Sequence, residues 1–330
     1  MEQQTARDNL SGKKRDESPR RPGESQASDL FKGLSFKVGV AENKNVTYRS
    51  KMEDVHTYIA NFAERVDWGY FAIFDGHAGK DTARWCGNNL HTLIANEINE
   101  EEDGPEHNYN YDMKEKLHDA FIKADKLIEN EGTGSSGSTA AVAVLRWELK
   151  DATGEPTAYS AGEDGKSQFD FIPSKDHKRI LYTSNVGDLR ILLCREGHPY
   201  RLSYDHKATD DNEVNRIRET GGLVMKNRVN GVLAVTRSLG DTYMKDLVVG
   251  RPFTTSTEIT PKDEFMILAC DGLWDVVPDQ KACQYVSELF KTNSDPQDAA
   301  KKLCQLAMDN STTDNVTVMI VKFDKRVFDI

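Results

Sequence analysis

Residues 70–79 read YFAIFDGHAG, a run of apolar and aromatic side chains that ends in Asp75-Gly76-His77. A short apolar run that stops at turn residues predicts a buried β-strand. A second such run ends at Cys270 and is followed by Asp271-Gly272. A carboxylate beside a strand end is held rigidly, and a following glycine lets a ligand approach the backbone. Asp-Gly is also a common turn, so either aspartate taken alone is more readily interpreted as a turn residue.

Other carboxylates occupy similar positions along the chain. Asp188 lies in a turn after a predicted strand, Asp314 lies just before the closing strand, and Glu53 and Asp54 begin another. If these side chains converge, they raise one another's pKa unless cations neutralise them. Oxygen ligands favour hard ions such as Mg²⁺ or Mn²⁺ over zinc. The recurrence therefore weakens the turn interpretation and favours a magnesium or manganese site.

The predicted strands come in consecutive groups, and the predicted helices come in pairs between them. Strands are expected at 36–40, 55–60, 70–74, 138–147, 180–186, 189–194, 265–269 and 316–321, and helices at 81–96, 113–128 and 210–220, with two more after Pro278 and Pro296. Asp210 and Glu213 have the spacing of a capping box at the start of the helix at 210–220. This order lacks the regular strand–helix alternation of a parallel sheet. It predicts an α+β fold in which helices are layered on antiparallel sheets.

Composition limits the classes of function. The chain has 330 residues and a formal net charge of −11, which argues against a nucleic-acid partner and against adsorption to anionic lipid. No apolar run is long enough to span a bilayer. The five cysteines are scattered, without C-x-x-C spacing, so neither a disulfide framework nor a structural zinc site is expected. We expect a reducing, cytoplasmic and nuclear location.

The chain is expected to hold one folded domain at 31–330 behind a disordered polar tail at 1–30. Basic runs at 13–15 and 20–21 could form a split import signal, although a solvated tail is the favoured interpretation. The polar, turn-rich stretch 150–177 is expected to be a surface insertion.

Signatures of other chemistries are incomplete in this chain. Residues 132–137 match G-x-G-x-x-G, but a predicted helix precedes them and a strand follows, the reverse of a dinucleotide site. No cysteine is followed by arginine six positions later, as cysteine-dependent phosphatases require. A Walker A loop and a G-x-S-x-G elbow are also missing.

Nine motifs, in order along the chain, resemble the type 2C (PPM) serine/threonine phosphatases. They are 49–54 (RSKMED), 75–79 (DGHAG), 137–140 (GSTA), 185–188 (NVGD), 205–207 (DHK), 221–222 (GG), 233–241 (LAVTRSLGD), 271–275 (DGLWD) and 314–315 (DN). Together they extend over about 36–321, and the ordered set is far more specific than any one motif. The chain is most similar to the small yeast-type members that act on stress-activated MAP kinases.

The resemblance implies a central β-sandwich of two antiparallel sheets flanked by pairs of helices, with two Mg²⁺ or Mn²⁺ ions. Carried over motif by motif, Asp75 would bridge the two ions. Glu53 and the backbone carbonyl of Gly76 would complete the coordination of one ion, and Asp271 and Asp314 would complete that of the other. A water bridging the ions would then attack phosphorus directly, without a phosphoenzyme intermediate.

The resemblance also implies supporting roles around these ligands. Asp188 would help to hold a weaker third ion, and Asp54 would orient a metal-bound water. Arg49 would bind phosphate oxygens, and His77 would protonate the departing serine or threonine oxygen. Residues from about 211 to 232 would form a flap beside the cleft, where substrate preference is set.

These features predict a monomeric phosphatase of phosphorylated proteins, with MAP kinases among its partners and a role as a negative regulator of stress signalling. An inactive binding module is the main alternative, and it is disfavoured because every expected ligand and Arg49 are present. A two-metal hydrolase of small phosphate esters is a further alternative. Leu189 replaces the serine usual in the family, and we expect this change to leave activity intact.

Overall fold

The computed structural model describes residues 34–102, 111–131, 134–150, 156–158 and 173–328. The expected tail, its basic runs and most of the expected insertion lie outside the described residues. Residues 156–158 of that insertion form strand β5, which pairs with β4 and so extends a sheet. Within the described ranges, no helix combines the length and the hydropathy that a bilayer span requires.

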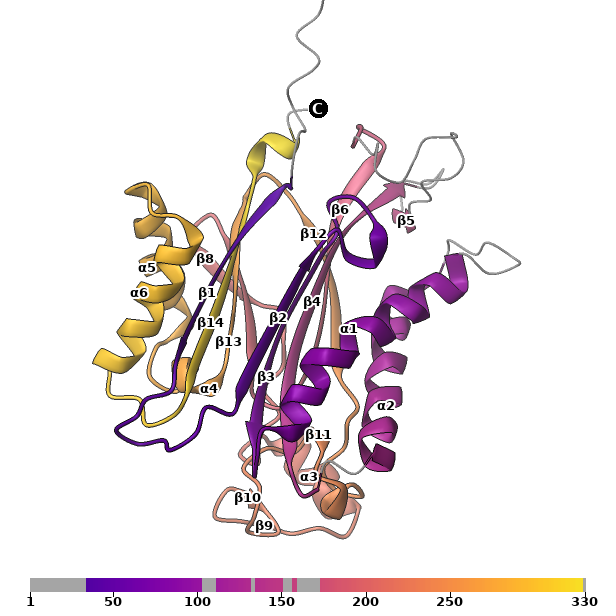
Figure 1. The fold of residues 1–330 in the computed structure, drawn as a ribbon, viewed down its shortest axis with the longest axis vertical. Helices are drawn as coiled ribbons and strands as arrows, with labels where there is room; N and C mark the ends of the chain where they lie inside the picture. The colour runs from indigo at the N-terminus through magenta and orange to yellow at the C-terminus, as the bar shows by residue number, and fades with distance from the viewer. Residues whose placement is uncertain (1–33, 103–110, 132–133, 151–155, 159–172, 329–330) are drawn as a thin grey trace, which may run out of the picture.

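Two antiparallel sheets lie face to face in the centre of the molecule (Figure 1). The first has the strand order β1-β14-β13-β7-β8 and the second β12-β6-β4-β3-β2, with β5 and β11 also paired to β4. The strands are β1 (Phe36–Asn43), β2 (Asp54–Ala60), β3 (Gly69–His77), β4 (Gly137–Lys150), β5 (Pro156–Ala158), β6 (His177–Val186), β7 (Arg190–Arg195), β8 (His198–Arg201), β11 (Leu239–Gly240), β12 (Phe253–Ile259), β13 (Asp263–Ala269) and β14 (Val316–Phe323). The predicted α+β sandwich is confirmed.

Helices cover the outer face of each sheet (Figure 1). The pair α1 (Asp81–Glu102) and α2 (Met113–Glu131) packs on the second sheet, and the pair α5 (Asp279–Lys291) and α6 (Pro296–Asp309) packs on the first. Shorter elements are α3 (Asp211–Glu219), α4 (Asp271–Trp274), the hairpin β9 (Val224–Met225) and β10 (Arg228–Val229), and the 3₁₀ turns η1 (Phe62–Glu64), η2 (Thr242–Met244) and η3 (Lys325–Phe328).

Strand β3 shows why the central strands are continuously apolar in sequence. Tyr70, Ala72 and Phe74 face α1 and α2, whereas Phe71 and Ile73 face the other sheet. Successive side chains of a strand point to opposite faces, and here both faces are covered by protein. The sandwich therefore has three apolar layers, one between the sheets and one beneath each helix pair.

The expected flap consists of α3 and the β9–β10 hairpin, at the same end of the sandwich as the end of β3 (Figure 1). Asp210 caps α3 as predicted, since its side chain accepts a hydrogen bond from the backbone N–H of Glu213 at 3.0 Å. The reciprocal half of the expected capping box is wrong. The Glu213 carboxylate instead accepts from Thr236 and Arg237 and so ties α3 to the body of the domain.

Two further sequence features have structural outcomes. Leu189 is fully buried in the layer between the sheets, so it contributes to packing there. Cys194 of β7 and Cys283 of α5 form a disulfide with a Cα–Cα distance of 5.9 Å. The structure thus has a single bridge, which the scattered cysteine spacing did not indicate, while Cys86, Cys270 and Cys304 are buried free thiols.

Candidate metal centre and active site

The second sheet supplies two carboxylates from neighbouring strands. Asp75 lies inside β3, which continues to His77, so the prediction that Asp75 follows the strand is corrected. It pairs directly with Asp54, the first residue of β2. Directly opposed residues of an antiparallel pair project to the same face of the sheet. Asp54 is buried and Asp75 is half-buried, so the two carboxylates are close in a poorly solvated place.

The first sheet supplies two more carboxylates at the same end of the sandwich. Asp271 is the first residue of α4, immediately after β13, and Asp314 precedes β14, the neighbouring strand. A Cβ atom on Gly272 would lie 1.9 Å from the carbonyl oxygen of Asn315. Only glycine permits this close approach of the two loops, which brings Asp271 and Asp314 into one neighbourhood.

These four aspartates and Asp188 lie close enough to repel one another. Burial raises the pKa of Asp75 well above its usual range, and the charges of Asp54, Asp271, Asp188 and Asp314 raise it further. Burial likewise raises the pKa of Asp271 well above normal, with added repulsion from Asp188 and Asp314. Like charges at short range disfavour the ionised form, which is the situation that divalent cations relieve.

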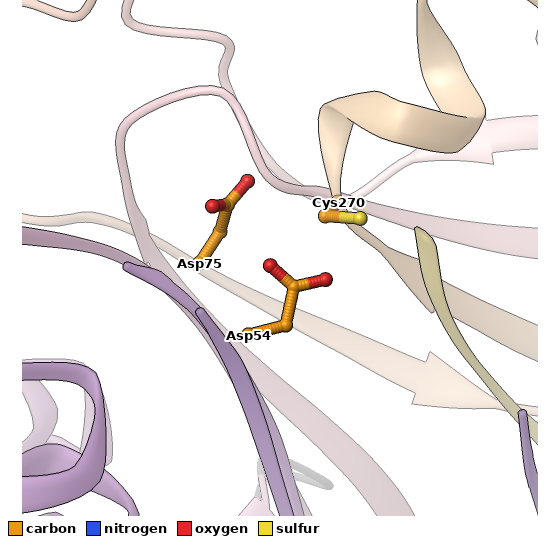
Figure 2. Close-up of side chains that lie close together, drawn as sticks. All are labelled: Asp54, Asp75 and Cys270. Carbon is orange, nitrogen blue, oxygen red and sulfur yellow. The ribbon is translucent and has the colours of Figure 1, made fainter. Parts of the chain in front are cut away.

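Asp54, Asp75 and Cys270 form the tightest part of the cluster (Figure 2), with one ligand-type atom from each within 4.8 Å of the others. The Thr317 hydroxyl donates to Oδ2 of Asp54 at 2.6 Å, and burial raises the pKa of Asp54 to about 6. Burial and the adjacent carboxylates raise the pKa of the Cys270 thiol well above normal. The Cys270 sulfur donates to the Asn315 carbonyl at 3.4 Å and accepts from the Thr317 N–H at 3.2 Å, and sulfur is a softer ligand than Mg²⁺ or Mn²⁺ prefers.

The cluster fits a hard divalent ion. Among the described residues, Oδ1 of Asp271 and Oδ1 of Asp54 are buried without a hydrogen-bond partner. A buried carboxylate oxygen without a partner is costly unless a cation or water completes it. The remaining donors are carboxylate and carbonyl oxygens, the chemistry that Mg²⁺ and Mn²⁺ prefer.

Glu53 and Gly76 are adjacent in the structure, as the resemblance implied. A Cβ atom on Gly76 would lie 2.8 Å from the backbone carbonyl oxygen of Glu53. The backbone N–H of Glu53 donates to the Asn315 side chain at 3.0 Å, which fixes the start of β2 against the loop that carries Asp314. The backbone at Glu53 is therefore held from the first sheet, and Gly76 is held within the second sheet by its pairing with Ser138.

Two cations border the carboxylate cluster. Nη2 of Arg49 donates to Oδ2 of Asp314 at 2.6 Å, and the arginine side chain is 46% exposed. Nζ of Lys207 lies 2.9 Å from Oδ1 of Asp275 and 3.6 Å from Oδ2 of Asp188. Arg49 is thus at the solvent edge of the cluster, while Lys207 partly neutralises Asp188.

The two histidines of the motifs have different surroundings. Nε2 of His77 lies 2.6 Å from Oδ2 of Asp241, and the ring is 26% exposed. His206 is buried beside the Gly187 carbonyl, and burial lowers its pKa to about 4. His206 is therefore a neutral structural residue, whereas His77 is accessible at the end of β3.

Sequence reasoning assigned no role to three charged residues that the structure places at this site. Asp275 repels Asp271 and Asp188, Lys207 offsets that repulsion, and Asp241 contacts His77. All three lie inside motifs that the resemblance had marked. The four-residue spacing of Asp271 and Asp275, one helical turn, was the signal that could have paired those two.

A family model described as "Protein phosphatase 2C" matches residues 38–150 and 165–316, most of the chain. Protein phosphatase 2C homolog 1 of *Saccharomyces cerevisiae* is 52% identical over 87% of this chain and 94% of its own length. Protein phosphatase 2C homolog 1 of *Schizosaccharomyces pombe* is 40% identical over 91% of this chain and 76% of its own length.

Solved structures agree on the fold. A phosphatase from *Toxoplasma gondii* has a TM-score of 0.67 and 21% identity, covering 88% of this chain and 94% of its own. A sex-determining protein of *Caenorhabditis elegans* has a TM-score of 0.68 and 22% identity, covering 91% of this chain and 67% of its own.

Proposed function

This chain belongs to the protein phosphatase 2C family of metal-dependent serine/threonine phosphatases, and we propose that it hydrolyses phosphoserine and phosphothreonine in proteins by direct attack of water at the carboxylate cluster. The observation that carries the proposal is the convergence of Asp75 from one sheet with Asp271 and Asp314 from the other. Carboxylates buried this close together need cations to neutralise their charge. A phosphate ester is a substrate that such cations bind.

We assign the ligands from this arrangement and from the family motifs. Asp75, Asp271, Asp314, Glu53 and the Gly76 carbonyl would hold two Mg²⁺ or Mn²⁺ ions. Asp188, together with Asp271, would help to hold a weaker third ion. When bound, such ions lower the pKa of water so that a nucleophile exists near neutral pH, and they neutralise charge on the phosphate.

The protein's own side chains would do the remaining work. Asp54, fixed by Thr317, would accept a hydrogen bond from the attacking water and orient it. Arg49 lies half-exposed beside Asp314 and has the planar fork that suits phosphate oxygens. His77 would protonate the departing serine or threonine oxygen, whose alkoxide is otherwise a poor leaving group. The flap at 211–232 would contact the polypeptide around the phosphorylated residue.

The proposed physiological role is negative regulation of stress signalling, with phosphorylated MAP kinases among the substrates. The motif resemblance to small yeast-type members supports it, and the 52% identity to a yeast protein phosphatase 2C homolog supports that resemblance. We also propose a monomer that acts in the cytoplasm and nucleus. The Cys194–Cys283 bridge does not favour that location, because disulfides are rare in reducing compartments.

The decisive experiment is hydrolysis of a phosphothreonine peptide by purified protein with Mn²⁺, Mg²⁺ or EDTA, beside Asp75→Asn and Asp271→Asn. We expect metal-dependent turnover that falls by at least roughly 10³-fold in either variant, since each removes a metal ligand. A wild-type protein that is inert with both metals would instead favour the inactive binding module. Faster turnover of nucleotides than of phosphopeptides would favour a small-ester hydrolase.

A further inference from the structure

The register of the second sheet places His77, Gly137 and Gly240 side by side on three neighbouring strands. His77 at the end of β3 pairs with Gly137 of β4, and Gly240 of β11 pairs with Gly137 from the other side. The residue after Gly240 is Asp241, which therefore begins on the far side of β4 from His77. Only a side chain reaching across Gly137 can connect the two.

Asp241 makes that connection. Its Oδ2 atom lies 2.6 Å from Nε2 of His77, and it also accepts a hydrogen bond from the Ser238 hydroxyl at 2.5 Å. Asp241 is completely buried. Since a carboxylate only accepts hydrogen bonds, Nε2 of His77 must carry the hydrogen and donate it. Among the described residues, none hydrogen-bonds to the other ring nitrogen, Nδ1.

The backbone holds Asp241 firmly in this position. Its φ angle is 47°, in the left-handed region that costs energy for a residue other than glycine. Its N–H donates to the Ser136 carbonyl at 3.2 Å. Asp125 of α2 accepts from the Gly240 N–H at 3.0 Å and from the Lys245 ammonium at 2.9 Å. Contacts from Ser136, just before β4, and from α2 thus keep a strained conformation that aims the carboxylate at His77.

Gly137 leaves room for the pair. A Cβ atom on Gly137 would lie 2.1 Å from Oδ2 of Asp241 and 2.3 Å from Nε2 of His77. Real Cβ atoms do not approach other atoms this closely, so any side chain at this position would separate the two groups. The absence of a side chain at Gly137 is what lets the His77–Asp241 contact form.

We propose that Asp241 is a positioning residue for His77, which fixes the tautomer with hydrogen on Nε2 and leaves Nδ1 as the nitrogen that protonates the leaving oxygen. This inference rests on the proposed function, and it specifies which ring nitrogen of His77 donates the proton. The oxygen of water bonds to phosphorus as the bond from phosphorus to the serine or threonine oxygen breaks. The Nδ1 proton passes to that departing oxygen, and the ring, now neutral, keeps its Nε2 hydrogen on Asp241.

The test compares two substrates in the presence of Mn²⁺. A phosphothreonine peptide has an alkoxide leaving group that needs a proton, whereas the nitrophenolate of p-nitrophenyl phosphate departs without one. We expect Asp241→Asn to lower kcat on the peptide by roughly 100-fold, while kcat on p-nitrophenyl phosphate changes less than about threefold. His77→Gln should show the same split, and the double variant should be no worse than His77→Gln.

Two more variants separate positioning from general damage. Gly137→Ala should reproduce the substrate split of Asp241→Asn, because its Cβ atom would force the pair apart. Asp263→Asn is the matched control, since Asp263 is equally buried but opens β13 at the end remote from Asp271. Its folded fraction should hydrolyse both substrates at the wild-type ratio.

Three results of these kinetic experiments would contradict the positioning role of Asp241, and a fourth would contradict the proposed function itself. Equal losses on both substrates in Asp241→Asn, or no loss on either, would overturn the positioning role. Additive losses in the double variant would also overturn it. Wild-type protein inert on both substrates would instead refute the proposed function, and this inference with it.

A spectroscopic readout is independent of turnover. In metal-free protein labelled with ¹⁵N-histidine, the His77 ring should show its hydrogen on Nε2, with assignment by His77→Gln. Asp241→Ala should abolish that preference while the resonances of His206, which contacts Gly187 instead, stay unchanged. A wild-type His77 ring with its hydrogen on Nδ1 would contradict the proposal.

Discussion

Aspartates with opposite surroundings flank strand β13, which begins with the buried Asp263 and is followed, after Cys270, by the half-buried Asp271. At one end Asp263 accepts two hydrogen bonds from the Arg195 guanidinium, at 2.8 and 3.0 Å, and two more from Thr260. At the other end Asp271 faces further carboxylates, and its Oδ1 is buried without a hydrogen-bond partner among the described residues. An aspartate is thus fully satisfied at the start of β13, whereas another just beyond the end of the strand is repelled by its neighbours.

This difference teaches how to separate structural acids from functional ones. A buried carboxylate that has all its partners stabilises the fold, and its removal leaves those partners unpaired. A buried carboxylate among other carboxylates destabilises the fold until a ligand arrives. Burial alone therefore does not mark a site, whereas burial among other carboxylates does.

The sharpest contrast is in stability without metal. In EDTA at pH 7.5, Asp263→Asn should lower the free energy of unfolding by roughly 2 to 3 kcal/mol, because Arg195 and Thr260 lose their acceptor. Asp271→Asn should raise it by roughly 1 kcal/mol, because it removes a repelled charge. Urea denaturation measures both. Equal destabilisation by the two variants would abolish the distinction between the ends of β13.

The pH dependence of stability should reveal the repelled cluster. The pKa of Asp54 rises from 3.8 to about 6 on folding, and those of Asp75 and Asp271 rise further. The native protein then binds more protons than the unfolded chain, so stability is greatest below the unfolded pKa and falls as pH rises. The ionisation of Asp54 alone should lower the free energy of unfolding of the metal-free protein by on the order of 3 kcal/mol between pH 4 and pH 7.

This slope is measured by urea denaturation of metal-free protein across that range. Asp54→Asn should make the decline shallower, whereas Asp263→Asn should leave its slope unchanged. A metal-free stability that rises steadily from pH 4 to pH 7 in the wild type would contradict the repulsion that we infer.

Bound metal should stabilise the protein through the carboxylate cluster around Asp271, and Asp263 should not contribute to this effect. At a free Mn²⁺ concentration 100 times its Kd, the wild type should gain about 2.7 kcal/mol, since the ion binds the native state. The gain should be smaller at pH 5.5, because protons compete for the carboxylates. Thermal denaturation with and without Mn²⁺ measures it. Asp271→Asn should lose most of the gain and Asp263→Asn should keep it; the reverse pattern would show that the metal binds elsewhere.

The variants Arg49→Ala and Arg195→Ala should differ mainly in their effect on the KM for a phosphopeptide. The Arg49–Asp314 pair is 46% and 33% exposed, so Arg49→Ala should cost under about 1 kcal/mol of stability. It should nevertheless raise KM for a phosphopeptide by roughly tenfold, because a phosphate-binding group is lost. Arg195→Ala should leave KM unchanged while lowering stability. An unchanged KM in Arg49→Ala would remove Arg49 from the proposed site.

Much of the fold could be predicted because its signals are local. The run at 70–74 has no polar residue on either face, which required a strand covered on both sides. Boundaries were less accurate, because pairing across the sheet decides them: β3 continues through Asp75 to His77 since Thr139, Ser138 and Gly137 of β4 remain opposite. The Glu213 side chain was misassigned for a similar reason, since its partners Thr236 and Arg237 are distant in sequence.

The sequence by itself determined the residue types of the site and their order, because each expected ligand lies in a short motif beside a strand or turn. Only the tertiary structure decided which of them meet. The register of β2 on β3 opposes Asp54 to Asp75, and the glycine contact of Gly272 with the Asn315 carbonyl brings in Asp314. Asp241 reaches His77 only across Gly137, a contact between residues 164 positions apart. Such contacts depend on register and on space left by glycine, which no local pattern encodes.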